Sequence, residues 1–267
     1  MSAYKITRLT IFPIKSLGGI DLEKSQVNSR GLEFDRQWML VNEKGEFLTQ
    51  REHHEMALFK LSDAGHHFVV SKAGQPDLKL EKYPTERPEK SVQVWSSKVK
   101  AWHIGEAADE WFSDAMGQYV HLVYMPQTTS RKVNFFKARN QDEVRFSDGY
   151  PTLIIGEAAL ELLNSKLETP VRMDNFRPNI VFSGGEPHDE DEWPQFKVGP
   201  ITFFGVKKCS RCVVVTIDQE TGKKMPYSEP LRTLVTYRKK NWKKIMFGQN
   251  LLHEGTGEIA TGMEIAF

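Results

Sequence analysis

The residues best suited to chemistry lie in one short stretch, 207–218, which reads Lys-Lys-Cys-Ser-Arg-Cys-Val-Val-Val-Thr-Ile-Asp. It contains both cysteines of the chain, Cys209 and Cys212, separated by Ser210 and Arg211. A thiolate acts as a nucleophile or a metal ligand when its charge is stabilised, and neighbouring basic side chains supply that stabilisation. The β-branched residues that follow, 213–217, predict a strand. The stretch therefore predicts a thiolate at the start of a strand.

Four interpretations of this cysteine pair compete. A thioredoxin-like dithiol needs its first cysteine at a helix N-terminus, which the β-branched continuation disfavours. A structural zinc site needs four ligands, and the sequence has no second Cys or His cluster at a suitable spacing. Two buried and inert thiols form the third interpretation. The fourth is a thiolate that binds a soft metal carried by an anionic organic cofactor. The residues alone leave the last two interpretations open.

Polar residues in several turns could hold the anionic part of such a cofactor. Lys15 and Ser16 share a turn whose backbone N–H groups, hydroxyl and ammonium suit an anion. Arg177 lies in Asn-Phe-Arg-Pro-Asn, and its planar guanidinium suits a phosphate. Arg36 lies in an apolar segment and needs a counter-charge, but its neighbour Asp35 would point to the opposite face of a strand. A solvated lysine and an internal salt bridge of Arg36 are the simpler alternatives.

Asp148 is a further candidate, in Phe-Ser-Asp-Gly-Tyr-Pro at 146–151. Its carboxylate could accept hydrogen bonds from the N–H groups of a heterocyclic ligand. It could equally close an Asx turn before the apolar residues that follow, and on the residues alone the turn is favoured.

Length and composition restrict the class of protein. The 267 residues suffice for one large domain or two small ones. The formal net charge is +1, so no overall field selects nucleic acid or an anionic membrane. No apolar run reaches the roughly 20 residues that span a bilayer, and the N-terminus lacks the apolar core of a signal peptide. With only two cysteines, we expect a cytoplasmic protein without disulfides, with neither nucleic acid nor membrane as a partner.

Short strands separated by turns dominate the predicted secondary structure, which is typical of a barrel or sandwich. Helices are predicted only at 105–117, 157–167 and 230–238. The polar and basic residues 126–146 are predicted to form a long loop. We therefore predict a β-rich α+β fold with two domains, 1–125 and 126–267.

Several separate motifs resemble those of the MOSC domain, which is named after the C-terminal part of molybdenum cofactor sulfurase. The cysteine stretch at 207–218 and Asn-Phe-Arg-Pro-Asn-Ile-Val at 175–181 are similar to that domain. Phe-Pro-Ile-Lys-Ser at 12–16 and Asp-Arg-Gln-Trp at 35–38 resemble the β-barrel domain that precedes it. The same pairing occurs in the mitochondrial amidoxime reducing component and in bacterial hydroxylaminopurine-detoxifying proteins. The resemblance implies two mixed β-barrel-like domains, a few peripheral helices and a cofactor cleft between the domains.

The resemblance also implies a role for each candidate residue. Cys212 would be the molybdenum ligand, Cys209 its neighbour, and Cys212 and Asp148 the catalytic residues. The phosphate end of a molybdopterin would be held by Lys15, Ser16, Arg36 and Arg177. Residues expected near the pterin are Asp148, Ser147, Asn175, Asn179 and Arg211.

The activity implied by the resemblance is the reduction of N-hydroxylated compounds, such as hydroxylaminopurines and amidoximes. Molybdenum would cycle between oxidation states two apart, with the thiolate and the dithiolene tuning its potential. A separate flavin or iron–sulfur protein would supply electrons, because the chain lacks cysteines for a cluster and ends without the ferredoxin domain of some bacterial relatives. Pyridoxal phosphate is not an expected cofactor. The alternatives are a non-catalytic carrier of the cofactor or its sulfur, and a β-barrel binding module with buried cysteines.

Overall fold

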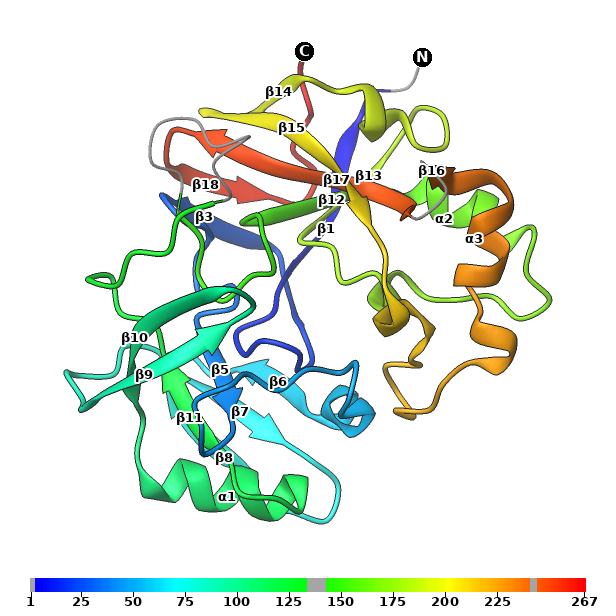
Figure 1. Ribbon diagram of the computed structural model, residues 1–267. Helices are drawn as coiled ribbons and strands as arrows, with labels where there is room; N and C mark the ends of the chain where they lie inside the picture. The colour runs from blue at the N-terminus through cyan, green and yellow to red at the C-terminus, as the bar shows by residue number, and fades with distance from the viewer. Residues whose placement is uncertain (1–2, 134–142, 241–243) are drawn as a thin grey trace.

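One long mixed sheet joins strands from both ends of the chain (Figure 1). The structure, a computed structural model, describes residues 3–133, 143–240 and 244–267. The strand order of this sheet is β14-β15-β17-β12-β13-β1-β2, and the short β16 pairs with β17. Its strands are β1 (Lys5–Ile11), β2 (Ile20–Leu22), β12 (Thr152–Gly156), β13 (Ile180–Ser183), β14 (Gln195–Val198), β15 (Ile201–Ser210), β16 (Lys239–Lys240) and β17 (Lys244–Glu254).

Three smaller sheets complete the β-structure. The first has the order β5-β11-β10-β9, from β5 (Trp38–Val41), β9 (Glu89–Val94), β10 (Ser97–His103) and β11 (His121–Tyr124). The second has the order β18-β3-β4, from β3 (Lys24–Asn28), β4 (Gly31–Leu32) and β18 (Gly257–Ala260). The third has the order β6-β7-β8, from β6 (Lys60–Asp63), β7 (His67–Ser71) and β8 (Leu78–Glu81).

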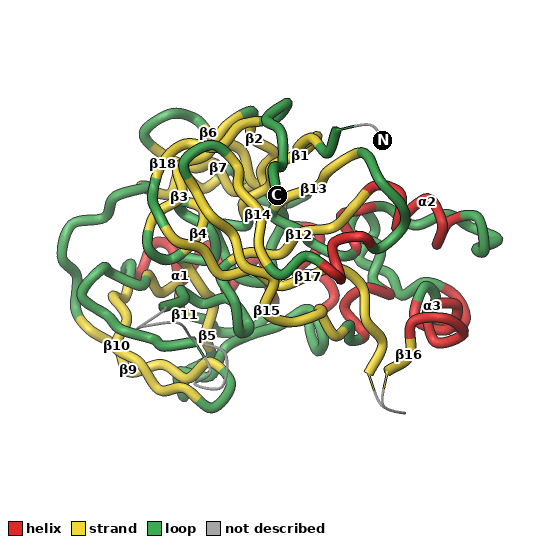
Figure 2. The backbone as a smooth tube through the Cα atoms, turned by 90° about the horizontal axis from the view of Figure 1, so that it is seen from above, coloured by secondary structure: helices red, strands yellow, loops and turns green. Residues whose placement is uncertain are grey.

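The helices are few and peripheral (Figure 2). In both views α2 (Glu157–Asn164) and α3 (Leu231–Arg238) lie at the end of the molecule opposite β9 and β10, and α1 (Glu106–Met116) lies against β11. Single 3₁₀ turns form at η1 (His54–Leu58), η2 (Met173–Asn175), η3 (Asp189–Glu192), η4 (Val213–Thr216) and η5 (Pro226–Ser228). The predicted β-rich α+β fold is thus confirmed, as are all three predicted helices.

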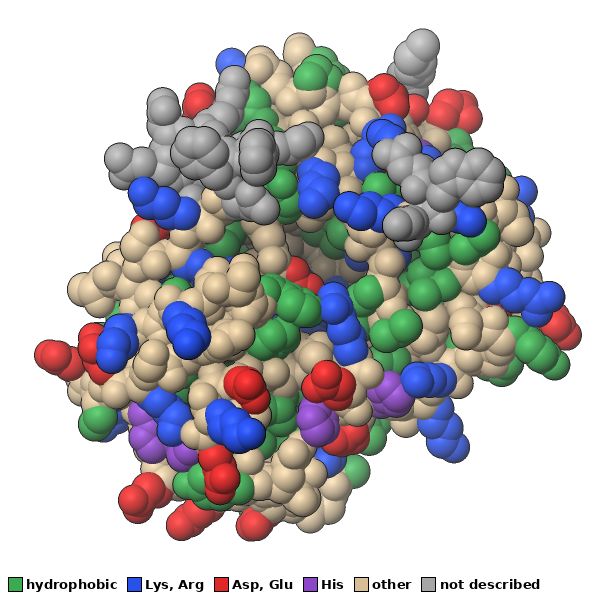
Figure 3. Space-filling view, viewed as in Figure 1, with side chains coloured by type: hydrophobic (Ala, Val, Ile, Leu, Met, Phe, Trp, Pro, Cys, Tyr) green, Lys and Arg blue, Asp and Glu red, His purple; other side chains and the backbone are tan. Residues whose placement is uncertain are grey.

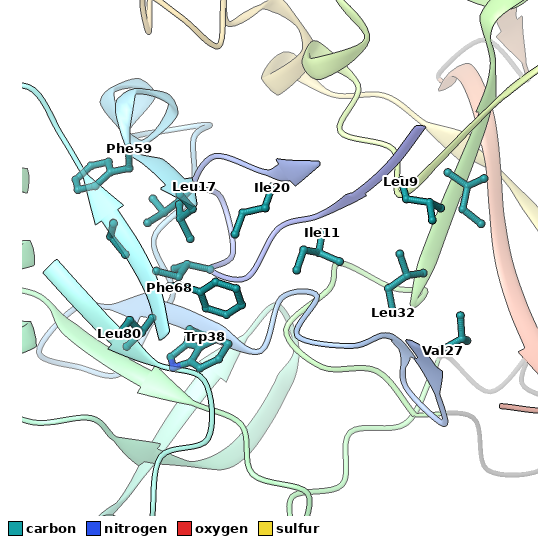
Figure 4. Close-up of a cluster of buried hydrophobic side chains, with 14 of the residues drawn as sticks. Leu9, Ile11, Leu17, Ile20, Val27, Leu32, Trp38, Phe59, Phe68 and Leu80 are labelled. Carbon is teal, nitrogen blue, oxygen red and sulfur yellow. The ribbon is translucent and has the colours of Figure 1, made fainter. Parts of the chain in front are cut away.

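The burial of the strands follows from their side-chain alternation. β14 and β3 alternate exposed and buried residues, so each has one face toward the core and one toward solvent. All four residues of β5 are buried, which fits a strand covered on both faces. The largest core cluster includes aromatic residues such as Trp38 and Phe68, whose ring centroids lie 5.8 Å apart (Figure 4). Aromatic packing of this kind supplies much of the apolar burial that holds the smaller sheets together.

Hydrogen-bonded strand pairs cross the predicted domain boundary. β1 pairs with β13, and β18 pairs with β3, so the first residues of the chain complete sheets with its last third. The division into 1–125 and 126–267 stays a prediction. Of the predicted loop 126–146, residues 134–142 lie outside the described residues, and Lys132 and Glu143 on either side of them form a β-bridge.

The prediction of a strand over 213–217 is wrong. β15 ends at Ser210, and Val213–Thr216 form the 3₁₀ turn η4, closed by a 2.7 Å hydrogen bond from Thr216 Oγ1 to the Val213 carbonyl. Val215 is buried in the second core cluster, and this packing outweighs the weak strand preference of β-branched residues. The cysteines therefore lie at the end of a strand. A single turn is also too short to supply the helix N-terminus that a thioredoxin-like dithiol needs.

An unusual carboxyl group lies in η3. The Glu190 side chain is fully buried, and neither of its carboxylate oxygens has a hydrogen-bond partner among the described residues. Burial raises the pKa of Glu190 to about 7, an effect that nearby backbone N–H groups only partly oppose. The neighbouring Asp191 instead pairs with Arg238 and with Lys208. Glu190 is therefore a group whose protonation is linked to stability.

We predict that Glu190→Gln removes a pH-dependent loss of stability. Between pH 4.5 and about 7 the folded protein holds a proton on Glu190 that the unfolded chain releases. The free energy of unfolding of the wild type should therefore fall as the pH rises through this window, by roughly 3 kcal/mol from this group. Urea unfolding of both proteins across the window measures the difference in slope. Glu192→Gln, whose side chain is 82% exposed, is the control, and parallel curves for wild type and Glu190→Gln would contradict the prediction.

Candidate functional site

A pocket of about 960 Å³, including space open to solvent, lies where the large sheet meets the N-terminal turns. Figure 3 shows a hollow near the middle of this face, with Lys and Arg side chains around it. All ten candidate cofactor residues line the pocket, although they come from five separate parts of the sequence. They are Lys15, Ser16, Arg36, Ser147, Asp148, Asn175, Arg177, Asn179, Arg211 and Cys212.

Lys15 and Asp148 form an ion pair in this pocket. The Lys15 side chain is buried, and its Nζ also donates a 2.8 Å hydrogen bond to the Phe146 carbonyl. Burial lowers the pKa of Lys15, and Asp148 opposes that shift. Burial alone would raise the pKa of Asp148, but the charge and hydrogen bond of Lys15, with a hydrogen bond from Trp95, hold it well below its usual range. Asp148 is therefore an ionised acceptor, which fits a ligand that presents N–H groups.

Arg36 finds its counter-charge in the residue next to it. Its Nη1 lies 2.7 and 2.8 Å from the two carboxylate oxygens of Asp35, and 3.1 Å from Asn179 Oδ1. The expectation that Asp35 points to the opposite face is wrong, because strand β5 begins only at Trp38 and Arg36 lies in the turn before it, with φ of 48°. Asp35 also accepts hydrogen bonds from the Phe12 amide and from Asn179. The internal salt bridge of Arg36 and its place in the pocket are thus both observed.

Arg177 has no such partner. No described residue forms an ion pair with its guanidinium, which lies over the Phe12 ring with Cζ 4.1 Å from the ring centroid. Arg36 stacks on the same ring at 4.3 Å. Burial first, and repulsion from Arg36 second, lower the pKa of Arg177 to about 9. The protein thus holds the guanidinium groups of Arg36 and Arg177 close together and provides an ion-pair partner for Arg36. An anion is therefore the natural partner of Arg177.

Three pocket residues adopt a backbone conformation that non-glycine residues rarely take. Ser16, Arg36 and Arg177 have φ of 68°, 48° and 54°. The left-handed region is costly for residues with a Cβ, and such strain persists only where surrounding contacts enforce it. All three residues are candidates for anion binding, and all three line the same pocket. Strained residues cluster at binding sites in general.

Two further polar groups in the pocket lack partners. Arg211 donates from Nε to the Phe247 carbonyl and from Nη1 to the Phe176 carbonyl, at 2.8 and 2.9 Å. Its Nη2 and the Thr152 hydroxyl are buried without a hydrogen-bond partner among the described residues. Buried polar groups are almost always hydrogen-bonded, so these two indicate a polar ligand. Five basic residues but one acidic residue line the pocket, which makes that ligand an anion.

Both cysteines line the same pocket as free, half-buried thiols. Cys209 is the penultimate residue of β15, and Cys212 lies just before η4 in an extended conformation, with φ of −124°. The pairing of Arg211 N with the Ile245 carbonyl, at 2.8 Å, fixes the backbone between them. The structure thus places both thiols in one pocket with the candidate anion-binding residues, while the roles of all these residues, and the choice of Cys212 over Cys209, stay predictions.

Sequence reasoning missed Gln50 and Arg51, which also line the pocket. The amides of Gln50 and Gln219 form a reciprocal pair, with two 3.1 Å hydrogen bonds that join the N-terminal half to the loop after the cysteines. Gln50 also donates to the Ser16 carbonyl at 2.7 Å. Arg51 stacks on Trp95 at 4.4 Å. A single glutamine in a turn has no sequence signal, so only the fold reveals this contact.

Comparison with known proteins places the chain in a family. Residues 3–119 match the family described as MOSC N-terminal beta barrel domain, and residues 141–266 match the MOSC domain. Mitochondrial amidoxime-reducing component 1 of Homo sapiens is 33% identical, over 96% of this chain and 81% of that protein. The chain belongs to the MOSC-domain family. This confirms the resemblance drawn from the motifs.

Two further similar proteins share less sequence with this chain. Mitochondrial amidoxime reducing component 2 of Rattus norvegicus is 30% identical over 87% of this chain and 72% of that protein. Molybdenum cofactor sulfurase of Oryza sativa subsp. japonica is 28% identical over 95% of this chain but only 33% of its own length. The family relation therefore supports a function connected with the molybdenum cofactor.

We predict that Arg177→Gln stabilises the cofactor-free protein. The variant removes a half-buried cation that has no ion-pair partner among the described residues, and the loss of its contact with Phe12 offsets only part of the gain. The free energy of unfolding should rise by about 1–3 kcal/mol, measured by urea unfolding of protein made in cells that cannot make the cofactor. Arg172→Gln, whose side chain is 59% exposed and ion-paired, is the control. A less stable Arg177→Gln variant would show that the protein alone satisfies this arginine.

Proposed function

We propose that this protein is a molybdenum-cofactor-dependent reductase of N-hydroxylated compounds, such as hydroxylaminopurines and amidoximes. The observation that supports it most is the pocket that combines a pair of free thiols with five basic side chains, among them Arg211, whose buried Nη2 has no hydrogen-bond partner among the described residues. Thiols suit a soft metal, and guanidinium donors suit a phosphate. The relatives named amidoxime-reducing components point to the same reaction class.

The residues of the pocket fit a molybdopterin. In the proposal, Arg177, Arg36, Lys15 and Ser16 bind its phosphate, since all four line the pocket and three of them adopt a left-handed backbone conformation. Asp148, Ser147, Asn175, Asn179 and Arg211 would bind or border the pterin, and the Cys212 thiolate would be the metal ligand. When bound, the cofactor supplies two-electron redox chemistry for oxygen removal from nitrogen. The catalytic residues proposed in the protein are Cys212 and Asp148.

The protein contributes binding, orientation and charge. The Lys15 ammonium keeps Asp148 ionised, so Asp148 accepts hydrogen bonds and does not donate a proton at neutral pH. The Phe12 ring contacts both the Arg36 and the Arg177 guanidinium groups and so helps to position them. The hydrogen-bonded Gln50–Gln219 pair joins the two proposed domains, 1–125 and 126–267, beside the pocket. This arrangement orients a ligand that both halves contact.

We propose that electrons come from a separate flavin or iron–sulfur protein. The chain has two cysteines, and both lie in the pocket, so it offers no ligand set for an iron–sulfur cluster of its own. Among the described residues, no helix has the length and apolar character that a bilayer crossing requires. The cytoplasmic location stays a prediction, and several relatives are named as mitochondrial proteins.

The second candidate function is a carrier that binds the cofactor or its sulfur without catalysis. One observation favours it: two thiols, where a metal ligand needs one, line the same pocket. The relation to molybdenum cofactor sulfurase fits either function. The two functions differ in turnover, and so they can be separated by experiment.

We predict that Cys212 and Cys209 differ in metal retention. Protein purified from cofactor-competent cells should carry about one molybdenum per chain, because a thiolate ligand adds to the phosphate contacts. Cys212→Ser should lose most of the metal, whereas Cys209→Ser, the matched control, should retain it. Elemental analysis by mass spectrometry, with the pterin measured in parallel by fluorescence, gives both contents. Full molybdenum in Cys212→Ser would remove Cys212 from the role of ligand.

We predict that the metal-loaded protein reduces N-hydroxylated substrates. With reduced methyl viologen as an artificial donor, 6-hydroxylaminopurine and benzamidoxime should be converted to the amine and the amidine, followed by chromatography. Cys212→Ser should lose the activity, because its metal content falls. A loaded wild type that turns over neither substrate, but carries a persulfide on one thiol, would establish the carrier function instead.

A further inference from the structure

A second cluster of potential ligands lies away from the cofactor pocket, in the unit formed by β10, α1 and β11. His103 ends β10, Asp109 lies in α1, and His121 begins β11. His103 Nε2 lies 2.6 Å and His121 Nδ1 lies 2.5 Å from the same oxygen, Asp109 Oδ2. The three ligand atoms all lie within 4.8 Å of one another. None of these residues lines the cofactor pocket.

The fold holds the carboxylate in a fixed orientation. The Asp109 side chain is only 4% exposed, and its other oxygen, Oδ1, accepts a 2.9 Å hydrogen bond from the Leu122 amide. This bond anchors helix α1 to β11 and leaves Oδ2 directed at the two imidazoles. β10 and β11 are adjacent antiparallel strands, with His103 paired to Val123, so their histidines come from neighbouring positions of one sheet. The cluster is therefore built by backbone elements on three sides.

We infer that His103, Asp109 and His121 form a binding site for a divalent transition metal, with Zn²⁺ as the best match. Two imidazole nitrogens and one carboxylate oxygen are a common zinc donor set, and three protein ligands leave a fourth position for water or another small ligand. The His103 side chain is 25% exposed and His121 is 12% exposed, so the site opens to solvent on the His103 side. Harder cations such as Mg²⁺ prefer oxygen donors and fit this set less well.

The geometry needs only a small adjustment to hold the metal. Zinc–ligand distances of about 2.0–2.2 Å place the ligands of a tetrahedral site about 3.3 Å apart. The nitrogen-to-oxygen distances of 2.6 and 2.5 Å are shorter, so the rings must move outward by less than about 1 Å. The more exposed His103 ring has the freedom to do so. The competing arrangement is a hydrogen-bonded triad, in which each ring donates an N–H to the carboxylate and no metal binds.

A metal here would join three elements that the chain brings together from positions 103, 109 and 121. It would fasten α1 to the sheet at the end where Asp109 already contacts β11. Because the metal binds the folded protein, its binding would raise the melting temperature in proportion to the logarithm of metal concentration. The cysteines lie in another part of the molecule, so the two sites can be tested independently.

Metal titration of the whole protein tests the inference. After treatment with a chelator, Zn²⁺ is titrated by calorimetry, and Co²⁺ is titrated by visible absorption. We expect one equivalent bound at this site, a tetrahedral cobalt spectrum without a thiolate charge-transfer band, and a melting temperature that rises with zinc. His103→Gln should weaken binding more than about 100-fold, because loss of a direct ligand costs more than loss of its supporting partners.

Three control variants separate this site from the alternatives. His66→Gln removes an exposed histidine from a turn, and Cys209→Ser and Cys212→Ser remove the thiols. All three should keep the nitrogen and oxygen ligand spectrum. His121→Gln is the second site variant, and circular dichroism in chelator checks that the site variants fold. No saturable binding in the wild type, or binding that survives both histidine variants, would overturn the proposal and leave the hydrogen-bonded triad.

Discussion

The pocket is organised by the placement of two guanidinium groups on one aromatic ring. Arg36 and Arg177 both lie over the Phe12 ring, and Asp35 forms its ion pair with Arg36. Packing two like charges on a ring in a buried place is unfavourable without an anion. The structure enforces the arrangement through the buried Asp35, which accepts from the Phe12 amide and from Asn179 as well. Binding of an anion would relieve a repulsion that folding has created.

The same constraint explains where the backbone is strained. The left-handed conformations at Ser16, Arg36 and Arg177 lie in turns that lead into or out of strands of the shared core. β1 ends just before Phe12, β5 begins just after Arg36, and β13 begins just after Asn179. The paired strands of the large sheet hold these turns in place, and the packing of the core offsets the energetic cost of the strained conformations. Stability of the sheet and readiness of the pocket are thus linked, as in sites where function requires a conformation that the local sequence does not favour.

Sequence reasoning succeeded where the signal was local or carried by several motifs at once. Short segments separated by turns predicted a β-rich fold, and periodic apolar residues predicted α1. It failed at 213–217, where buried packing of Val215 outweighed β-propensity. It also failed at Asp35, because the period-two rule for opposite faces applies only inside a strand and Arg36 precedes one. The ten pocket residues were assembled by the resemblance, since no spacing along the chain shows that positions 15, 36, 148, 177 and 212 meet.

The two clusters of the molecule differ in a way that bears on what each can hold. In the pocket the protein provides more basic than acidic side chains, and the buried Nη2 of Arg211 has no hydrogen-bond partner among the described residues. At His103, Asp109 and His121 every approaching atom already has a partner, and the same atoms can exchange protons for a metal. The pocket therefore favours an anionic ligand because of its excess positive charge, while the histidine cluster favours a metal that prefers nitrogen and oxygen donors. The charge of the pocket calls for a ligand, whereas the histidine cluster is stable with or without one. The pocket is therefore the feature of the fold that bears most directly on the proposed function.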